Sequence, residues 1–190
     1  MAAVVYSTEN QSGIDINQVF ILDPTTPEYP APPFQPGEKA TGTDGSEWVW
    51  CTASITIAAS SVVRVSEVPG SWSVALIGGA TVATAPTGDF VGVVGGGTGK
   101  VVVPAPSGKQ TGTYFWVQRA GNCPNVNCAA GTTANVALHS SATVGGQVTV
   151  AAGGSGTTYL ISGMVISQAT GSTTGPNTAV LNYPTVGATG

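Results

Sequence analysis

Residues 112–150 carry the pattern that most restricts what this chain can fold into. An aromatic run at residues 114–119, which ends at Gly121, is followed by short runs rich in Val, Thr and Ala with glycine between them. Such runs are typical of short strands joined by turns. Small apolar residues alternate with Ser, Thr and Asn, and charge is almost absent. The pattern predicts a sheet surface that other protein covers, with no visible chemistry on it.

The whole chain shares this lack of charge. Only 7% of its 190 residues are charged, against an average of about 25%. Its 27 glycines are about twice the usual fraction, and the helix formers Lys, Glu and Arg are scarce. A monomeric soluble protein normally keeps more surface charge than this. We therefore expect a surface that is polar but uncharged, or one that is covered in an assembly.

Short apolar runs follow one another from residue 48 onward, with Gly or Pro between them. Strands at this spacing predict an all-β fold, either a β-sandwich or a barrel-like domain. The last long run can form two strands with a bend at Gly163. The runs expected to form strands are 48–58, 62–68, 72–77, 90–94, 100–103, 114–119, 136–139, 147–150, 159–168 and 179–181.

Residues 1–47 differ from the rest in charge and in proline content. They carry seven acids and one base, a net charge of −6, whereas residues 48–190 carry two acids and four bases, a net charge of +2. Six of the thirteen prolines fall between Pro24 and Pro36, and proline cannot donate to a sheet ladder. We therefore predict an extended, acidic, proline-rich N-terminal arm at 1–47 and a β-rich domain at 48–190, with a hinge at 37–47.

Aromatic and apolar residues are threaded through this arm, and residues 19–22 are expected to form a short strand in it. A disordered linker rarely carries so many apolar residues. An ordered arm, lying along its own domain or along a neighbour, fits better. Because the strands of the domain begin near residue 47, the domain is expected to fold without residues 1–36. The candidate contacts with a partner or a second subunit are Phe20, Tyr29, Phe34 and Trp116.

The three cysteines allow more than one interpretation. Cys123 and Cys128 can close a small loop as a disulfide, because a turn at Pro124 would bring them together. Free thiols are the alternative, which a reducing cytoplasm favours. Cys51 and His139 are the other metal ligands on offer, and their spacing does not suit a zinc module. We expect neither a metal nor a cofactor.

The residue types of known catalytic sites do not combine into a recognisable motif. His139 is the only histidine, and Ser140 beside it would point to the opposite face of a strand, which argues against a hydrolase triad. The glycine-rich segment 95–100 lacks the Ser or Thr that follows the lysine of a Walker motif. Glu67 and Asp89 would form a glycosidase pair only if the fold placed them across a cleft. We therefore expect a protein that is not an enzyme.

Nucleic-acid and membrane partners are not expected either. Four bases spread over residues 48–190 do not form a basic patch. The sequence has no run of about 20 apolar residues that could span a bilayer. Its first residues lack the basic start and apolar core of a signal peptide, so synthesis in a cytoplasm is the expectation.

The stretch from Gly108 to Gln147 resembles a recurring pattern in the capsid decoration, or cement, proteins of tailed bacteriophages. Its aromatic strand reads Tyr114-Phe-Trp-Val-Gln-Arg-Ala-Gly121, and short Val-rich runs separated by glycine follow it. The ending, with Gly163-Met-Val-Ile and Ala179-Val-Leu-Asn-Tyr-Pro184, is similar to such virion proteins too. The proline-rich arm and the segment with the two nearby cysteines depart from the small decoration proteins.

This resemblance implies a homotrimer at local three-fold positions of a capsid, with termini that reach the major capsid protein. We therefore expect a structural virion protein, made in the host cytoplasm, that binds the outer capsid surface and cements neighbouring capsid subunits. One alternative is a head-fibre or receptor-binding module that recognises glycans. The second alternative is a carbohydrate-degrading enzyme.

Overall fold

The computed structural model of this chain is all-β, as the sequence predicts, and the residues that it describes contain no helix. The structure describes residues 5–7, 14–22, 32–53, 55, 57–68, 71–79, 88–95, 101–102, 112–150 and 158–189. The strands are β1 (Val5–Ser7), β2 (Val19–Leu22), β3 (Lys39–Gly42), β4 (Glu47–Ala53), β5 (Ile57–Ala58), β6 (Val62–Val68), β7 (Ser71–Leu76), β8 (Phe90–Val94), β9 (Val101–Val102), β10 (Gly112–Cys128), β11 (Leu138–Ser140), β12 (Val148–Thr149), β13 (Tyr159–Ile166) and β14 (Gly175–Thr189).

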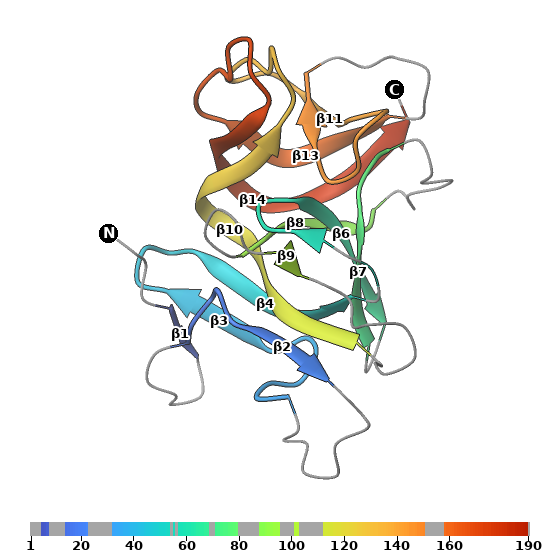
Figure 1. Cartoon of the computed structure of the whole chain (residues 1–190). Helices are drawn as coiled ribbons and strands as arrows, with labels where there is room; N and C mark the ends of the chain where they lie inside the picture. The colour runs from blue at the N-terminus through green and yellow to red at the C-terminus, as the bar shows by residue number, and fades with distance from the viewer. Residues whose placement is uncertain are drawn as a thin grey trace.

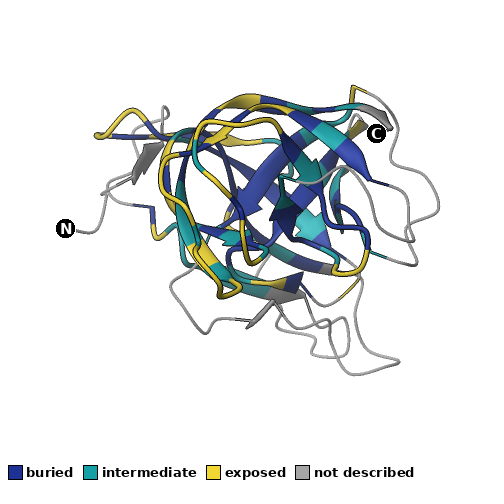
Figure 2. Ribbon diagram, turned by 90° about the horizontal axis from the view of Figure 1, so that it is seen from above, coloured by how far each residue is buried: buried dark blue, intermediate teal, exposed yellow. Residues whose placement is uncertain are grey.

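Twelve of these strands form one sheet that closes on itself twice. The first closed ring, here the first barrel, runs through β4, β7, β6, β8 and β10 and back to β4. The second closed ring, the second barrel, runs through β10, β14, β13, β11 and β12 and back to β10. The first lies below the second in Figure 1, and Figure 2 shows the strands surrounding buried residues. Of the two folds expected from the sequence, the barrel-like one is therefore found.

The long strand β10 belongs to both barrels. Its residues 113–118 pair with β4. Ala120 pairs with both β4 and β14, and the residues from Gly121 to Cys128 pair with β14, so the chain passes here into the second barrel. The expectation that this strand ends at Gly121 is wrong. Gly121 takes φ 88°, a left-handed conformation that bends a strand without ending it. Pro124 falls in the bulge between Cys123 and Val126, where a missing N–H leaves no ladder bond unmade.

The same bulge decides the state of the cysteines. Because it adds a residue to β10, Cys123, Val126 and Cys128 all face the interior of the protein, and all three cysteines are free and buried. Several residues of extended chain, at roughly 3.3 Å of rise each, separate Cys123 from Cys128, so no loop brings them together. Burial raises the pKa of Cys123 to about 11 and that of Cys128 to about 12, and it raises the pKa of Cys51 as well.

Apolar side chains gather in three clusters. The cluster inside the first barrel contains Val49, Cys51, Ala53, Ile57, Val63, Val65, Val74, Val94, Phe115 and Val117. A second cluster fills the second barrel and the outer side of β6 and β8; it contains Val62, Ile77, Val91, Val93, Cys123, Val126, Cys128, Leu138, Val148, Tyr159, Ile161, Met164, Ile166, Ala179, Leu181 and Val186. Both faces of β8 are thus buried, which explains its near-continuous apolar sequence.

The third cluster lies outside the first barrel, under the N-terminal segment. It contains Ile14, Phe34, Ala40, Trp48, Trp50 and Trp116. Phe34 packs edge-on against Trp50 and Trp116, with ring centroids 5.3 and 5.0 Å apart. Trp116 points to this cluster while its neighbours Phe115 and Val117 point into the first barrel. The aromatic run of β10 is therefore buried on both faces.

The described strands of the N-terminal segment belong to the sheet of this same chain. The expected strand at 19–22 is confirmed as β2, which pairs with β10, and β1 pairs with β3. The expectation of a hinge at 37–47 is wrong, because β3 and β4 form a hairpin there. The strip of prolines at residues 24–30 lies outside the described residues.

Most of the other expected strands are confirmed. β6 and β8 have the predicted bounds of 62–68 and 90–94. Gly163 does not separate two strands; it lies within the single strand β13, where the register with β14 shifts. Two strands are longer than predicted, because β10 extends to Cys128 and β14 begins at Gly175.

The turn of the β3–β4 hairpin touches β10 where this strand leaves the first barrel. Asp44 Oδ1 accepts hydrogen bonds from the Ser46 N–H and hydroxyl at 3.0 and 2.6 Å, and the Ser46 hydroxyl accepts one from Trp48 Nε1 at 2.9 Å. The Ser46 donors lower the pKa of Asp44. A Cβ on Gly121 would lie 2.7 Å from Ser46 Cα, so only glycine lets the turn and the strand meet.

We predict that Gly121→Ala destabilises the protein by roughly 2–4 kcal/mol, because a left-handed alanine and an overpacked contact both oppose folding. Gly131→Ala is the matched control, since Gly131 also has a positive φ, of 76°, but has no atom within 4 Å of its would-be Cβ. The control should lose only about 1 kcal/mol. Urea unfolding curves measure both losses, and equal losses would contradict the close approach.

We also predict that residues 1–36 are needed for stability, because Phe34 of this segment packs on Trp116 of β10. The sequence led to the opposite expectation, that the domain folds without them. Trp116 is only 1% exposed and Phe34 only 7%, so Trp116→Ala and Phe34→Ala should each cost about 3–5 kcal/mol. Ile55→Ala, at a residue that is 43% exposed, should change stability by about 0.5 kcal/mol or less. The losses should be the same at low and high protein concentration. A loss that grows on dilution would instead place these aromatic residues between subunits.

Candidate functional site

An irregular segment of β14 places Tyr183 on the surface where the two barrels meet. Ser162 pairs with Thr185 and Met164 with Leu181, so one residue of β13 faces three residues of β14. Tyr183 sits in this bulge at φ 46°, a left-handed conformation that is uncommon outside glycine. The facing residue is Gly163, whose missing Cβ leaves room for the Asn182 carbonyl oxygen. The bulge holds Tyr183 45% exposed to solvent.

Arg119 lies beneath Tyr183 and closes the end of the first barrel. It alternates along β10 with Phe115 and Val117, so it shares their inward face. Its Nη1 donates to Glu67 Oε1 at 2.9 Å, and its guanidinium carbon lies 4.0 Å from the centroid of the Phe90 ring. The side chain is 8% exposed, and its Nε has no hydrogen-bond partner. The cation is therefore held by one carboxylate and by aromatic rings.

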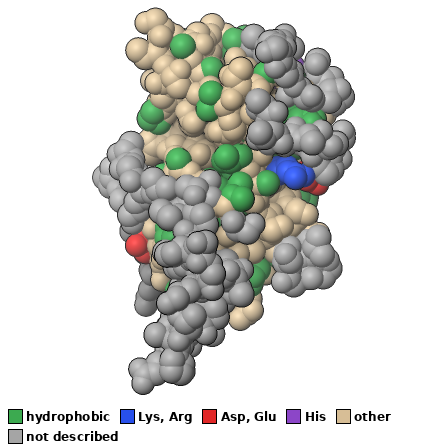
Figure 3. Space-filling model, turned by 45° about the vertical axis from the view of Figure 1, so that its right-hand side comes forward, with side chains coloured by type: hydrophobic (Ala, Val, Ile, Leu, Met, Phe, Trp, Pro, Cys, Tyr) green, Lys and Arg blue, Asp and Glu red, His purple; other side chains and the backbone are tan. Residues whose placement is uncertain are grey.

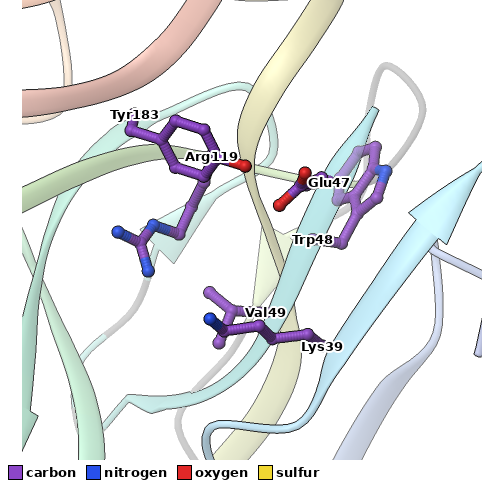
Figure 4. Close-up of a pocket in the computed structure, with 6 residues that line it drawn as sticks. All are labelled: Lys39, Glu47, Trp48, Val49, Arg119 and Tyr183. Atoms are coloured by element: carbon purple, nitrogen blue, oxygen red, sulfur yellow. The ribbon is translucent and has the colours of Figure 1, made fainter. Parts of the chain in front are cut away.

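The β3–β4 hairpin brings Glu47 and Lys39 to the same place. Glu47 begins β4 and pairs with Ala120 of β10, and Lys39 of β3 pairs with Val49. The Tyr183 hydroxyl donates a hydrogen bond to the Glu47 carboxylate, which raises the pKa of Tyr183. Figure 4 shows the Tyr183 hydroxyl directed toward Glu47, with Lys39 on the other side of the hollow.

The hollow between these side chains is small. It is lined by Lys39, Glu47, Trp48, Val49, Arg119 and Tyr183, and its cavity volume is about 10 Å³, which is room for one water molecule. Pockets that enclose a drug-sized ligand are some hundred Å³. The junction of the barrels therefore offers a surface for contact, built on a preformed cluster of charges and rings.

The structure brings only some of the sequence-predicted contact residues together. Phe34 and Trp116 lie side by side in the third apolar cluster, where contacts within the chain cover them. Phe20 is half-buried, with its ring centroid 6.2 Å from that of Tyr114. Tyr29 lies outside the described residues. Of the three described residues, Phe20 is the most exposed to solvent.

Sequence reasoning did not single out Tyr183, Glu47 or Lys39 as a group. Tyr183 comes directly before a proline and directly after Asn182, and Arg119 is the last charged residue of the chain. Those two positions are the signals that the sequence offers. The contact itself depends on the pairing of β10 with β4 and of β13 with β14, which local pattern does not determine.

The carboxylates and hydroxyls considered for catalysis are engaged in structural contacts. Glu67 pairs with Arg119, and Asp89 pairs with Arg64 at 3.4 Å. The Ser140 hydroxyl accepts a hydrogen bond from the Tyr159 N–H at 3.0 Å. His139 lies half-buried on β11 between Leu160 and Thr149, its pairing partners on β13 and β12. The lysine of the glycine-rich segment at 95–100 lies outside the described residues.

Comparison with known proteins finds no relative of this chain. No model of a protein family matches the chain, no curated protein matches its sequence, and no solved structure matches its fold. Among the described residues, three or more His, Cys, Asp or Glu side chains nowhere gather as metal ligands would. The described segments also contain no helix of the length and apolarity needed to cross a bilayer.

We predict that Glu67→Gln destabilises the protein by about 1–3 kcal/mol. Removing one partner of a fully buried ion pair costs about 3–5 kcal/mol, and we reduce that range because the Glu67 side chain is 32% exposed. Asp89→Asn is the matched control, since the pair of Asp89 with Arg64 is longer and both of its side chains are partly exposed. It should cost at most about 1 kcal/mol. Thermal unfolding at low and high salt measures both, and a larger loss for Asp89→Asn would contradict this account of the site.

Proposed function

We propose that the protein is a structural virion protein that binds the outer surface of a phage capsid and cements neighbouring capsid subunits. One observation carries the proposal: charge is confined to one part of the fold. All fourteen charged residues of the chain lie in residues 1–119, and residues 120–190 contain no Asp, Glu, Lys or Arg. The second barrel, apart from its shared strand β10, is built entirely from that neutral part.

The neutral part also exposes apolar side chains. Of the six large apolar residues that are exposed among the described ones, five belong to it: Val136, Val144, Val165, Val180 and Tyr183. Val165 and Val180 are directly paired across β13 and β14, and they are 43% and 52% exposed. In Figure 3 the upper part of this face shows hydrophobic and uncharged groups, with neither acidic nor basic side chains. Removing water from a surface of this kind costs little free energy when another protein covers it.

A cementing role needs this kind of contact. A protein that bridges capsid subunits stabilises the shell through many weak contacts, and a trimer multiplies them through effective concentration. The resemblance of residues 108–147 to decoration proteins supports a homotrimer bound to the major capsid protein. β1 and β2 stand at the two ends of the strand order, so each offers an edge to which a partner strand can add.

The enzymatic alternative has less support. A glycosidase needs two carboxylates that face one another across a cleft. Here Glu67 and Asp89 are each paired with an arginine of this chain, and the hollow at the junction holds about 10 Å³. Trp48, Trp50 and Trp116 are buried and Trp72 is half-buried, so a glycan-binding module would need another, more exposed aromatic residue.

Binding to capsids tests the proposal. Empty capsids of the same virus that lack this chain are incubated with the purified protein and imaged by electron cryomicroscopy. We expect added density between capsid subunits and binding that changes less than about threefold as salt rises, because a neutral surface is not screened. Val165→Asp with Val180→Asp should weaken binding at least about tenfold, or about 1.4 kcal/mol.

The control for that double variant is Ile55→Asp, since Ile55 is as exposed as Val165 but lies outside the neutral part. It should bind capsids as the unaltered protein does. Absence of added density would overturn the proposal. Binding that falls steeply with salt would show that the charged part of the chain, and not the neutral part, makes the contact.

A further inference from the structure

We propose that Tyr183, flanked by Glu47 and Lys39, is a stacking platform for the pyranose ring of a neutral carbohydrate. This function goes beyond attachment to a capsid, and it concerns the junction of the barrels, where Tyr183 of the neutral part meets Glu47 and Lys39 of the charged part. It rests on three features of the site: a ring that contacts within the chain orient, polar groups at its edge, and the absence of net charge.

Contacts within the chain orient the Tyr183 ring in the free protein. The guanidinium carbon of Arg119 lies 5.8 Å from its centroid, and Glu47 holds its hydroxyl. The backbone keeps a φ of 46° at this residue, and strained residues of this kind are retained where a side chain must point in a particular direction. With the residue 45% exposed, the rest of the ring remains open to solvent. A ligand that stacks there orders little that is not already ordered.

The groups around the ring match the rim of a sugar. A pyranose has a face of C–H groups, which packs on an aromatic ring, and a rim of hydroxyls, which need both donors and acceptors. The Glu47 carboxylate has about four acceptor sites, and one hydroxyl of Tyr183 occupies only one of them. The Lys39 ammonium is exposed and has no ion-pair partner among the described residues, so its three donors are available. Charge-assisted hydrogen bonds of this type are the stronger ones.

Charge and shape select this ligand over others. Two cations, Lys39 and Arg119, stand beside two anions, Glu47 and Glu67, so the cluster has no net charge to attract phosphate or an acidic peptide. A protein partner would usually anchor a large side chain in a pocket. A hollow of about 10 Å³ admits no such side chain, whereas a flat sugar ring needs only the surface of the tyrosine.

Saturation-transfer NMR on the full chain tests the proposal. The probes are maltotetraose, cellotetraose, tetra-N-acetylchitotetraose and mannotetraose, each at up to about 20 mM, with inorganic phosphate and the peptide acetyl-Gly-Trp-Gly-amide as competing classes. We expect at least one sugar to bind with a Kd on the order of 1 mM, which corresponds to about −4 kcal/mol. Its C–H face should receive the strongest saturation.

Variants connect that binding to Tyr183. Tyr183→Asn keeps a residue that tolerates the left-handed conformation and should weaken binding at least about tenfold. Tyr183→Phe keeps the ring but not the hydrogen bond to Glu47, and it should weaken binding by about threefold. Ile55→Ser, at an exposed residue between β4 and β5 that does not line the hollow, should leave binding unchanged. Thermal unfolding of each variant confirms that it is folded.

Three results would overturn the proposal: binding of none of the four sugars, binding that Tyr183→Asn leaves unchanged, or binding of the peptide or of phosphate in place of the sugars. Because the measurement uses the isolated protein, it is independent of capsid attachment. A protein that binds capsids but no sugar would contradict only this inference, and the reverse result would contradict only the capsid proposal.

Discussion

The structure depends on one strand that serves two barrels. β10 supplies a wall to the first barrel and then to the second, so one strand borders both hydrophobic interiors. The transition falls at Gly121, where the turn of the β3–β4 hairpin lies against the strand backbone. An L-residue there would meet both a steric and a conformational penalty. One glycine thus joins the hairpin of the N-terminal region to the passage between the barrels.

Arg119 is buried where β10 passes from the first barrel to the second, so its charge must be compensated there. A guanidinium in a barrel end needs a counter-charge, and Glu67 from β6 supplies it while Phe90 and Tyr183 cover its faces. These partners come from three strands that are distant in sequence. The ion pair therefore fixes how β6, β8 and β14 stand around β10, which is the kind of specificity that a buried polar contact can provide.

The sequence predicts the fold class and most strands because those features are local. β6 and β8 follow from β-branched runs between turn residues, and their bounds are as expected. β10 is longer than predicted because Gly121 and Pro124, which favour turns, are accommodated here by a bend and a bulge. The Gly, Thr and Asp residues of 37–47 suggest a hinge, but they suit a hairpin turn equally well. The group of Arg119, Glu47 and Tyr183 is set by strand register, which no local pattern specifies.

The two surfaces of this molecule differ in what they can recognise. The neutral part offers paired valines and hydroxyls, so its contacts depend on shape and burial, and their strength varies little with salt. The junction of the barrels offers an exposed aromatic ring with a carboxylate and an ammonium beside it, so its contacts depend on the direction of hydrogen bonds. The first kind suits a large partner that covers an extended area, and the second suits a small polar ligand. Tyr183 lies on β14, as Val180 does, so the tyrosine platform stands at the edge of the neutral part, where Glu47 and Lys39 of the charged part meet it.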